Sequence, residues 1–167
     1  MKPIDIASEK AVPVPDKAVL RRAVLEHRDA LEPADRAARS DAICARVADM
    51  LVGQAPAVVS AYWPIRSEVD PRPLIDLSRR LGAEVTLPAI AGGSLVFRRW
   101  RDGEPFFNVG FGLSEPGPGQ PELVPDLMLV PMAGFDRSGH RLGYGKGYYD
   151  RAIAALRAAG GSPRLLG

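Results

Sequence analysis

The sequence predicts an α/β fold, namely a single three-layer α/β/α domain with a mostly parallel, Rossmann-like central sheet. Segments with strand character alternate with segments of helical period, which is the order that a mostly parallel sheet requires. Two predicted strands are nearly continuous in apolar residues, as expected for strands that helices cover on both faces. The 167 residues fit one domain, which we assign to residues 16–167.

Proline and glycine delimit four predicted helices. Asp16 is a suitable N-cap for the first helix, whose apolar residues recur at roughly helical period. Pro33 ends that helix and begins a second one, which stops at Gly53. The other two helices are expected over residues 71–82 and 148–160. The apolar face of the second helix is expected to consist of Ile43, Val47, Met50 and Leu51.

Strands are predicted where apolar and β-branched residues cluster in short runs. They cover residues 57–65, 84–90, 94–100 and 126–135. Residues 101–125 are rich in Gly and Pro, so we expect a long loop there. The final residues, SPRLLG, begin as one more strand would and then stop. We therefore expect the domain to be truncated at its C-terminal end.

Composition argues against several classes of protein. A net charge of +2 is too small to indicate nucleic acid or a membrane surface as a partner. The single cysteine, Cys44, excludes a disulfide framework and is expected to be buried filler in a helix. This cysteine usage, without a visible signal peptide or apolar membrane span, predicts a cytoplasmic protein. We expect residues 1–15 to form a flexible tail and the protein to be a monomer.

The stretch RLGYGKGYYDR, residues 141–151, lies between a predicted strand and the last helix. Its glycines let backbone N–H groups converge on an anion, and the helix N-terminus adds partial positive charge. The P-loop pattern fails because Gly147 follows Gly145-Lys146, and the dinucleotide fingerprint fails because the glycines run G-x-G-x-G. Arg141 and Lys146 would repel the helix dipole unless an anion lay between them. We therefore favour a phosphate site over a plain flexible turn.

Other side chains suit a ligand site, and each also has a simpler structural interpretation. Lys17 and Arg21 share a helix face near its start, where they would grip an anion or form a solvated surface. Asp150 follows the loop directly and would share Mg²⁺ with a nucleotide or only favour the helix N-terminus. Tyr148 and Tyr149 would stack on a flat ring or fill the core.

Ligands of α/β sheets bind at the carboxyl ends of the strands. The loops to consider are therefore IRSEVD, after the first predicted strand, and GFDRSGHRLGYGKG, after the last. Glu68, in the first of these loops, would accept hydrogen bonds from a ring amide or amino group, or would be only a surface acid.

Together these segments resemble a known family. GFDRSGHRLGYGKGYYDR is similar to the signature of the 5-formyltetrahydrofolate cyclo-ligases, also called methenyltetrahydrofolate synthetases. KAVLR, YWPIRSEVD, FGLSEP and LMLVPMAGFD match in order and spacing, so the resemblance covers nearly the whole chain after the tail. It departs at the end, because family members continue past the position of Gly167 and carry a second acidic residue near the metal.

The resemblance implies a three-layer α/β fold, a requirement for ATP and Mg²⁺, and 5-formyltetrahydrofolate, with or without a polyglutamate tail, as substrate. It also implies that Asp150 binds the metal. ATP contacts would fall on Lys17, Arg21, Arg141, Leu142, Gly143, Tyr144, Gly145, Lys146, Gly147, Tyr148 and Tyr149. Folate contacts would fall on Glu68, Phe111, Tyr144, Gly145, Lys146, Gly147 and Tyr148.

The implied reaction is the ATP-dependent closure of 5-formyltetrahydrofolate to 5,10-methenyltetrahydrofolate, with release of ADP and phosphate. Phosphorylation of the formyl oxygen makes it a good leaving group, and N10 then attacks the activated carbon. Phosphoryl transfer depends on positioned positive charge, and we assign Arg141 and Lys146 to the β- and γ-phosphates as the catalytic residues. Two other classes stay open: a sugar-phosphate isomerase or acyl-group transferase that needs no ATP, and a catalytically inactive nucleotide- or folate-binding module.

Overall fold

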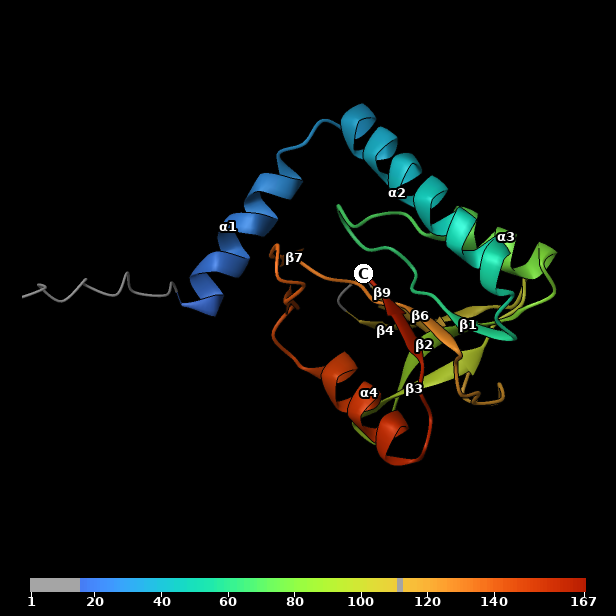
Figure 1. The fold of residues 1–167 in the computed structure, drawn as a ribbon. Coiled ribbons are helices and arrows are strands. Elements are labelled where there is room, and N and C mark those ends of the chain that lie inside the picture. The colour runs from blue at the N-terminus through green and yellow to red at the C-terminus, as the bar shows by residue number, and fades with distance from the viewer. Residues whose placement is uncertain (1–15, 111–112) are drawn as a thin grey trace, which may run out of the picture.

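A five-stranded sheet forms the centre of the domain in the computed structural model, which describes residues 16–110 and 113–167 (Figure 1). The strands lie in the order β3-β2-β1-β6-β9. β1 pairs in parallel with β2 and β6, β6 pairs in parallel with β9, and β3 runs antiparallel at one edge. This mostly parallel sheet confirms the predicted fold class, and β9 is the strand expected at SPRLLG. The strands span Val58–Ser60 (β1), Glu84–Ala91 (β2), Ser94–Arg99 (β3), Leu127–Leu129 (β6) and Arg164–Leu166 (β9).

Helices cover both faces of the sheet, which gives the three predicted layers (Figure 1). α2 (Pro33–Gln54) and α3 (Arg72–Arg80) lie on one face, and α4 (Tyr148–Ala158) lies on the other. The alternation along β6 explains this arrangement, because successive side chains of a strand point to opposite faces. Leu127 and Leu129 pack in the cluster under α2 and α3, whereas Met128 packs against α4.

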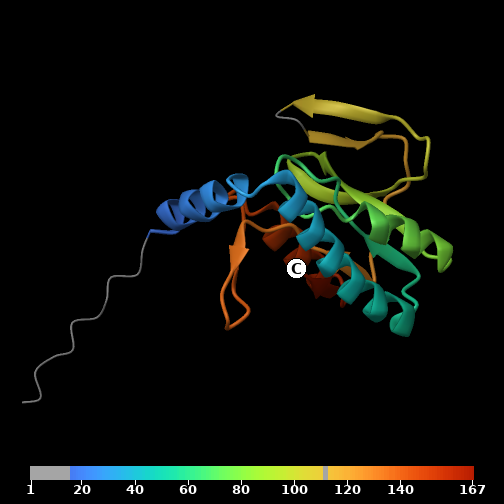
Figure 2. The same cartoon turned by 90° about the horizontal axis from the view of Figure 1, so that it is seen from above.

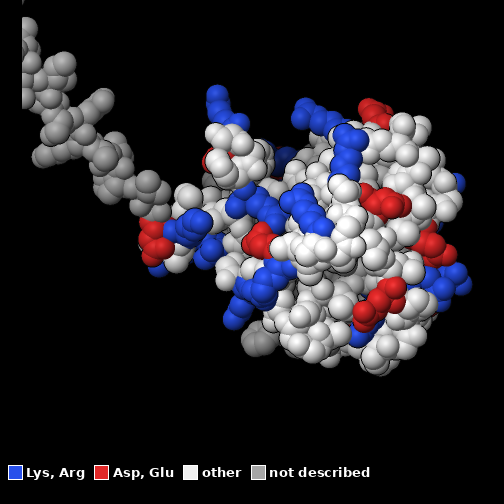
Figure 3. Space-filling view, turned by 60° about the horizontal axis from the view of Figure 1, so that its bottom comes forward, with Lys and Arg blue, Asp and Glu red and all other residues white. Residues whose placement is uncertain are grey.

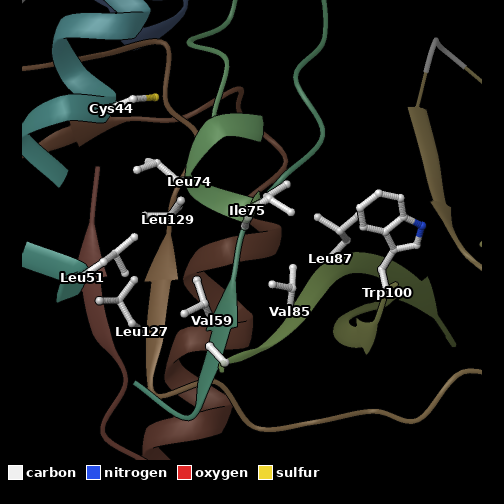
Figure 4. Close-up of a cluster of buried hydrophobic side chains, with 12 residues drawn as sticks. Cys44, Leu51, Val59, Leu74, Ile75, Val85, Leu87, Trp100, Leu127 and Leu129 are labelled. Atoms are coloured by element: carbon white, nitrogen blue, oxygen red, sulfur yellow. The ribbon is translucent and has the colours of Figure 1, made fainter. Parts of the chain in front are cut away.

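The larger core lies between the sheet and the pair α2 and α3 (Figure 4). Cys44 and Leu51 of α2 enter this core, so the prediction that Cys44 is a buried structural residue is confirmed. The prediction that Ile43 belongs to the apolar face is wrong, because its side chain is 43% exposed. Residues 44 and 51 lie about two turns apart and define the buried stripe, which leaves position 43 beside it.

The N-terminal helix α1 (Lys17–Asp29) stands apart from the sheet and lies next to β7 (Figure 1). Its predicted N-cap is confirmed, because the Asp16 carboxylate accepts a hydrogen bond from the backbone N–H of Ala18 at 3.0 Å. Pro33 begins α2 as predicted, but α2 continues one residue past Gly53 to Gln54, and its C-cap, Ala55, adopts the left-handed conformation. None of the side chains of α1 is buried, so this helix is held by surface contacts.

Part of the loop expected over residues 101–125 is instead a β-hairpin, so that prediction is wrong. β4 (Phe106–Gly110) pairs antiparallel with β5 (Leu113–Pro116), and Figure 2 shows the hairpin set to one side of the helices. Phe106 anchors it, because its ring stacks on Trp100 at a centroid distance of 5.0 Å and lies 4.8 Å from Trp63. The high Gly and Pro content of this segment hides the hairpin in the sequence. Phe111 and the predicted tail, residues 1–15, lie outside the described residues.

The strand predicted over residues 126–135 is interrupted. β6 ends at Leu129, and a separate two-stranded hairpin forms from β7 (Gly134–Phe135) and β8 (Arg141–Leu142). Pro131 lies between them and has no N–H to donate to a sheet. The interruption releases the chain from the sheet just before the glycine-rich stretch. Across residues 16–110 and 113–167, no helix combines the length and apolar character needed to cross a membrane.

Candidate functional site

The site lies where the loops after β1 and β6 meet. These two strands are neighbours in the sheet and run in parallel, so their carboxyl ends open at the same edge. The first loop carries Glu68, and the second leads through β7 and β8 to the glycine loop, which we define as residues 143–147. The two loops meet at Arg28 of α1, which donates hydrogen bonds to the Ser67 hydroxyl in the first loop and to the Tyr144 hydroxyl in the second. The structure therefore brings together two of the segments that the sequence marked for ligands.

The glycine loop needs glycine at two positions for its backbone conformation. Gly145 has φ of 96° and Gly147 has φ of 64°, both in the left-handed region that other residues rarely adopt. Gly147 is also the N-cap of α4, whose first N–H groups have no acceptor within the helix. Lys146, between these glycines, is exposed, and its side chain has no hydrogen bond or ion pair to the residues that the structure describes. An anion at this turn would therefore meet a helix N-terminus and an available ammonium group.

Helix α1 lies over the glycine loop. Arg21 donates a hydrogen bond from Nε to the carbonyl oxygen of Gly143 at 2.6 Å. Its guanidinium carbon lies 3.3 Å from the position that a Cβ atom would occupy at Gly145, so a larger residue there would press on Arg21. Lys17, one turn earlier on the helix, is exposed. Figure 3 shows Lys and Arg side chains gathered around the end of the molecule that carries α1.

Arg141 and Asp150 form an ion pair with each other in this structure. The Asp150 side chain is 72% exposed and lies in the first turn of α4, beside the glycine loop. Within the described parts of the chain, no group of three or more His, Cys, Asp or Glu side chains is arranged to hold a metal. Mg²⁺ is commonly held by one or two carboxylates together with substrate phosphates and water. Asp150 fits the role of a single carboxylate ligand whose partners come from a nucleotide.

Glu68 is nearly enclosed by protein, with 9% of its surface exposed. Its Oε2 accepts a hydrogen bond from the backbone N–H of Ile65 at 3.0 Å, which fixes the carboxylate in place. A cavity of about 330 Å³ opens beside it, within the range of small-molecule sites. Trp63 and two arginines without a side-chain partner among the described residues, Arg36 and Arg66, also line this cavity. Trp63 and Arg66 lie in or beside a loop that the sequence analysis marked, but it singled out neither of them, and it missed Arg36 of α2.

The charge of Glu68 acts on two nearby tyrosines. Burial, followed by interaction with the Glu68 carboxylate, raises the pKa of Tyr144 to about 12. Burial also raises the pKa of Tyr149, with a further contribution from the charge of Glu68. The Tyr149 ring packs with the core under α4, and its hydroxyl is buried without a hydrogen-bond partner among the described residues. Tyr148 instead lies under the guanidinium of Arg151, 5.1 Å from the ring centroid.

Arg28 is a further residue of the site that the sequence analysis missed. It projects from α1 and donates hydrogen bonds to the Ser67 hydroxyl at 3.0 Å, the Met132 carbonyl at 3.3 Å and the Tyr144 hydroxyl at 3.1 Å. The available signal was its spacing, because Arg21 and Arg28 lie about two helical turns apart and therefore share a face.

An α/β domain with a basic glycine-rich turn at the carboxyl ends of its central strands belongs to the class of proteins that bind phosphorylated ligands at that edge. Comparison with known proteins identifies the family within this class. The family model for 5-formyltetrahydrofolate cyclo-ligases matches residues 13–167. The chain belongs to the 5-formyltetrahydrofolate cyclo-ligase family, whose members are ATP-dependent ligases that close 5-formyltetrahydrofolate. This confirms the resemblance and the class of reaction predicted from the sequence.

Individual relatives agree with this assignment. A 5-formyltetrahydrofolate cyclo-ligase of Mycolicibacterium smegmatis is 35% identical over 148 residues, which cover 82% of this chain and 74% of the relative. The cyclo-ligase of Escherichia coli strain K12 is 29% identical over 102 residues, 57% of this chain. That match spans 56% of the length of the E. coli protein.

Solved structures show the same fold. The 5,10-methenyltetrahydrofolate synthetase of Aquifex aeolicus superposes with a TM-score of 0.72 at 30% identity, over 83% of this chain and 72% of that one. The corresponding Mycoplasma pneumoniae protein superposes with a TM-score of 0.69 at 22% identity, over 85% and 79% of the two chains.

Proposed function

We propose that this chain closes 5-formyltetrahydrofolate to 5,10-methenyltetrahydrofolate with consumption of ATP, at the junction of α1, the glycine loop and the loop that carries Glu68. The junction at Arg28, which hydrogen-bonds to Ser67 beside Glu68 and to Tyr144 in the glycine loop, carries this proposal. It joins a phosphate-type turn to the loop whose carboxylate, Glu68, lines a small-molecule cavity. A reaction that transfers phosphate from a nucleotide to a heterocyclic substrate needs these two sites side by side.

The nucleotide would lie between α1 and the glycine loop. Arg21 and Lys17 approach from the helix, and Lys146 and the N-terminus of α4 approach from the loop. Arg141 forms an ion pair with Asp150 in this structure. We propose that, when the nucleotide binds, the Arg141 guanidinium binds its phosphates and the Asp150 carboxylate binds Mg²⁺. Bound there, Mg²⁺ would neutralise phosphate charge as it develops during transfer.

The folate would lie in the cavity beside Glu68. A pteridine ring presents an amide N–H and an amino group, which the fixed Glu68 carboxylate is suited to accept. Tyr144 of the glycine loop is near enough for Glu68 to raise its pKa, so the formyl group would be held toward the glycine loop. Phe111, which we also assign to this pocket, lies outside the described residues. A polyglutamate tail would lead away from Glu68 toward solvent.

In the proposed reaction the γ-phosphoryl group moves from ATP to the formyl oxygen, and ADP leaves. The lone pair of N10 then attacks the formyl carbon, the C–O bond breaks, and phosphate departs with that oxygen while N10 gives up its proton. The residues contribute position and charge: Arg141 and Lys146 at the phosphates, and Glu68 at the ring. We further propose that residues 16–167 act as one domain of a cytoplasmic monomer, without nucleic acid or membrane partners.

A turnover assay tests this function. The protein is mixed with 5-formyltetrahydrofolate and MgATP, and the near-ultraviolet absorption of the conjugated methenyl product is followed, with a control that omits ATP. We expect product that forms only with ATP. Binding of both ligands without turnover would identify an inactive binding module, and the failure of both binding and turnover would overturn the proposal.

A further inference from the structure

Arg28 joins three separate segments of the chain through one guanidinium. Nε donates to Ser67 in the loop after β1, Nη1 to the carbonyl of Met132 after β6, and Nη2 to Tyr144 in the glycine loop. The next residue of α1, Asp29, accepts a hydrogen bond from the same Ser67 hydroxyl. The last turn of α1 therefore makes two hydrogen bonds to the buried Ser67 hydroxyl, one as donor and one as acceptor.

Two of these acceptors, Ser67 and Tyr144, lie close to Glu68. Ser67 precedes it in the chain and is almost fully buried. Tyr144 accepts a hydrogen bond from Arg28, and the nearby charge of Glu68 contributes to its raised pKa. Glu68 lines the cavity, and Arg28 hydrogen-bonds to Ser67 and Tyr144, which lie beside Glu68. A shift of α1 would therefore change the position of Glu68.

The opposite end of α1 leads to the glycine loop. Arg21, on the same face, bonds to Gly143, and Val24 between the two arginines packs so closely on Gly134 that a Cβ atom there would lie 3.0 Å away. None of the side chains of α1 is buried, so few apolar contacts hold this helix in place. Elements of this kind open at low free-energy cost, and ligands that touch them shift their equilibrium.

We propose that Arg28 is a positioning residue that couples the two substrate sites through α1, an inference that rests on the proposed function. A nucleotide that binds Lys17 and Arg21 orders α1, and the ordered helix holds Ser67 and Tyr144 through Arg28, so Glu68 is set to receive the folate. By linkage the folate strengthens nucleotide binding by the same factor. The planar fork of arginine is essential, because lysine offers a single ammonium that does not match three acceptors at once.

Calorimetry measures this coupling without turnover. The Kd of 5-formyltetrahydrofolate is determined with and without Mg²⁺ and a non-hydrolysable ATP analogue, for the wild type, Arg28→Ala and Arg28→Lys. Arg22→Ala is the matched control, because Arg22 lies on the exposed side of the same helix and, among the described residues, its side chain pairs only with Glu26, at 3.9 Å. We expect the analogue to tighten folate binding about tenfold in the wild type and in Arg22→Ala, within the usual range of coupling. The factor should fall to near one in Arg28→Ala and Arg28→Lys.

Hydrogen exchange of the α1 amides gives a second readout. The analogue should slow exchange in the wild type, and the effect of folate on the same amides should disappear in the Arg28 variants. A folded Arg28→Lys protein that keeps the wild-type coupling factor overturns the proposal, as does a wild type that binds both ligands independently. A wild type that binds neither ligand instead removes the proposed function, and the inference falls with it.

Discussion

Arg21 and Gly143 lie 122 positions apart in the chain, yet Nε of Arg21 donates a 2.6 Å hydrogen bond to the carbonyl oxygen of Gly143. This contact places a cation of α1 directly over the glycine loop. It also means that one wall of the proposed nucleotide site belongs to a helix without buried side chains. Ligand binding and the position of that helix should therefore depend on each other.

Replacement of Arg21 by alanine should weaken nucleotide binding. Hydrogen bonds to charged groups contribute about 1.5–3 kcal/mol, which corresponds to a rise of about 10- to 100-fold in the KM for ATP. Steady-state kinetics with the folate held at saturation measures this effect. Arg22→Ala, on the exposed side of the same helix, should leave the KM for ATP unchanged. Equal effects of the two substitutions would show that only the net charge of α1 matters.

Replacement of Lys146 by alanine should lower turnover and leave the fold intact. The side chain is exposed and makes no hydrogen bond or ion pair to other described residues, so its loss costs little stability. Removal of a charge aimed at the transition state typically lowers the rate about 10²- to 10³-fold. The measurement is kcat together with a thermal melt. Arg157→Ala, at an exposed position of α4, is the control, and unchanged turnover in Lys146→Ala would remove the lysine from the mechanism.

Replacement of Asp150 by asparagine should raise the concentration of Mg²⁺ that the enzyme needs. The amide is neutral and binds a hard cation more weakly than a carboxylate does. We expect the Mg²⁺ concentration for half-maximal turnover to rise by about tenfold at a fixed ATP concentration, since a tenfold change corresponds to the loss of about 1.4 kcal/mol. Asp49→Asn, at an exposed position of α2, serves as the control. An unaltered Mg²⁺ titration would exclude Asp150 as a ligand.

Two half-buried tyrosines should respond in opposite ways to replacement by phenylalanine. The Tyr149 hydroxyl is buried without a partner in the described structure, so Tyr149→Phe removes a desolvated polar group and should preserve or raise the melting temperature. Tyr62 donates to the Val69 carbonyl at 3.1 Å, so Tyr62→Phe leaves that oxygen unpaired and should cost about 1–3 kcal/mol. If Tyr149 contacts a ligand, Tyr149→Phe should also weaken binding. A destabilised Tyr149→Phe would reveal a partner for this hydroxyl.

Alkaline pH should destabilise the protein through Tyr144 and Tyr149. Burial raises the pKa of Tyr149, and burial and Glu68 raise that of Tyr144 to about 12, whereas tyrosine in an unfolded chain titrates near 10. The folded state then holds more protons than the unfolded state above about pH 10, so the free energy of unfolding falls as pH rises from 10 toward 12. Denaturant titrations across this range should show a shallower fall for Tyr149→Phe. If the free energy of unfolding falls equally steeply with pH in Tyr149→Phe and in the wild type, Tyr149 does not contribute to the loss of stability.

Local sequence signals predicted much of the fold. Asp16 and Pro33 marked helix starts because capping and the geometry of proline act over a few residues. The hairpin of β4 and β5 escaped prediction because its anchor, Phe106, packs on Trp100 and on Trp63, and Trp63 is distant in the chain. The exposed position of Ile43 also escaped, because the exact rotation of α2 is set by what packs against it.

The sequence by itself determined the α/β class, the family, and the glycine loop with its neighbouring cations, since each depends on residue types at short spacing. The tertiary structure decided which of these residues meet. It paired Arg141 with Asp150, brought Tyr144 near Glu68, and placed Arg28 at the junction of three segments. These contacts arise because the parallel neighbours β1 and β6 open at one edge of the sheet, and α1 crosses both loops there. No local pattern encodes such a meeting, since it depends on the order in which the strands pair.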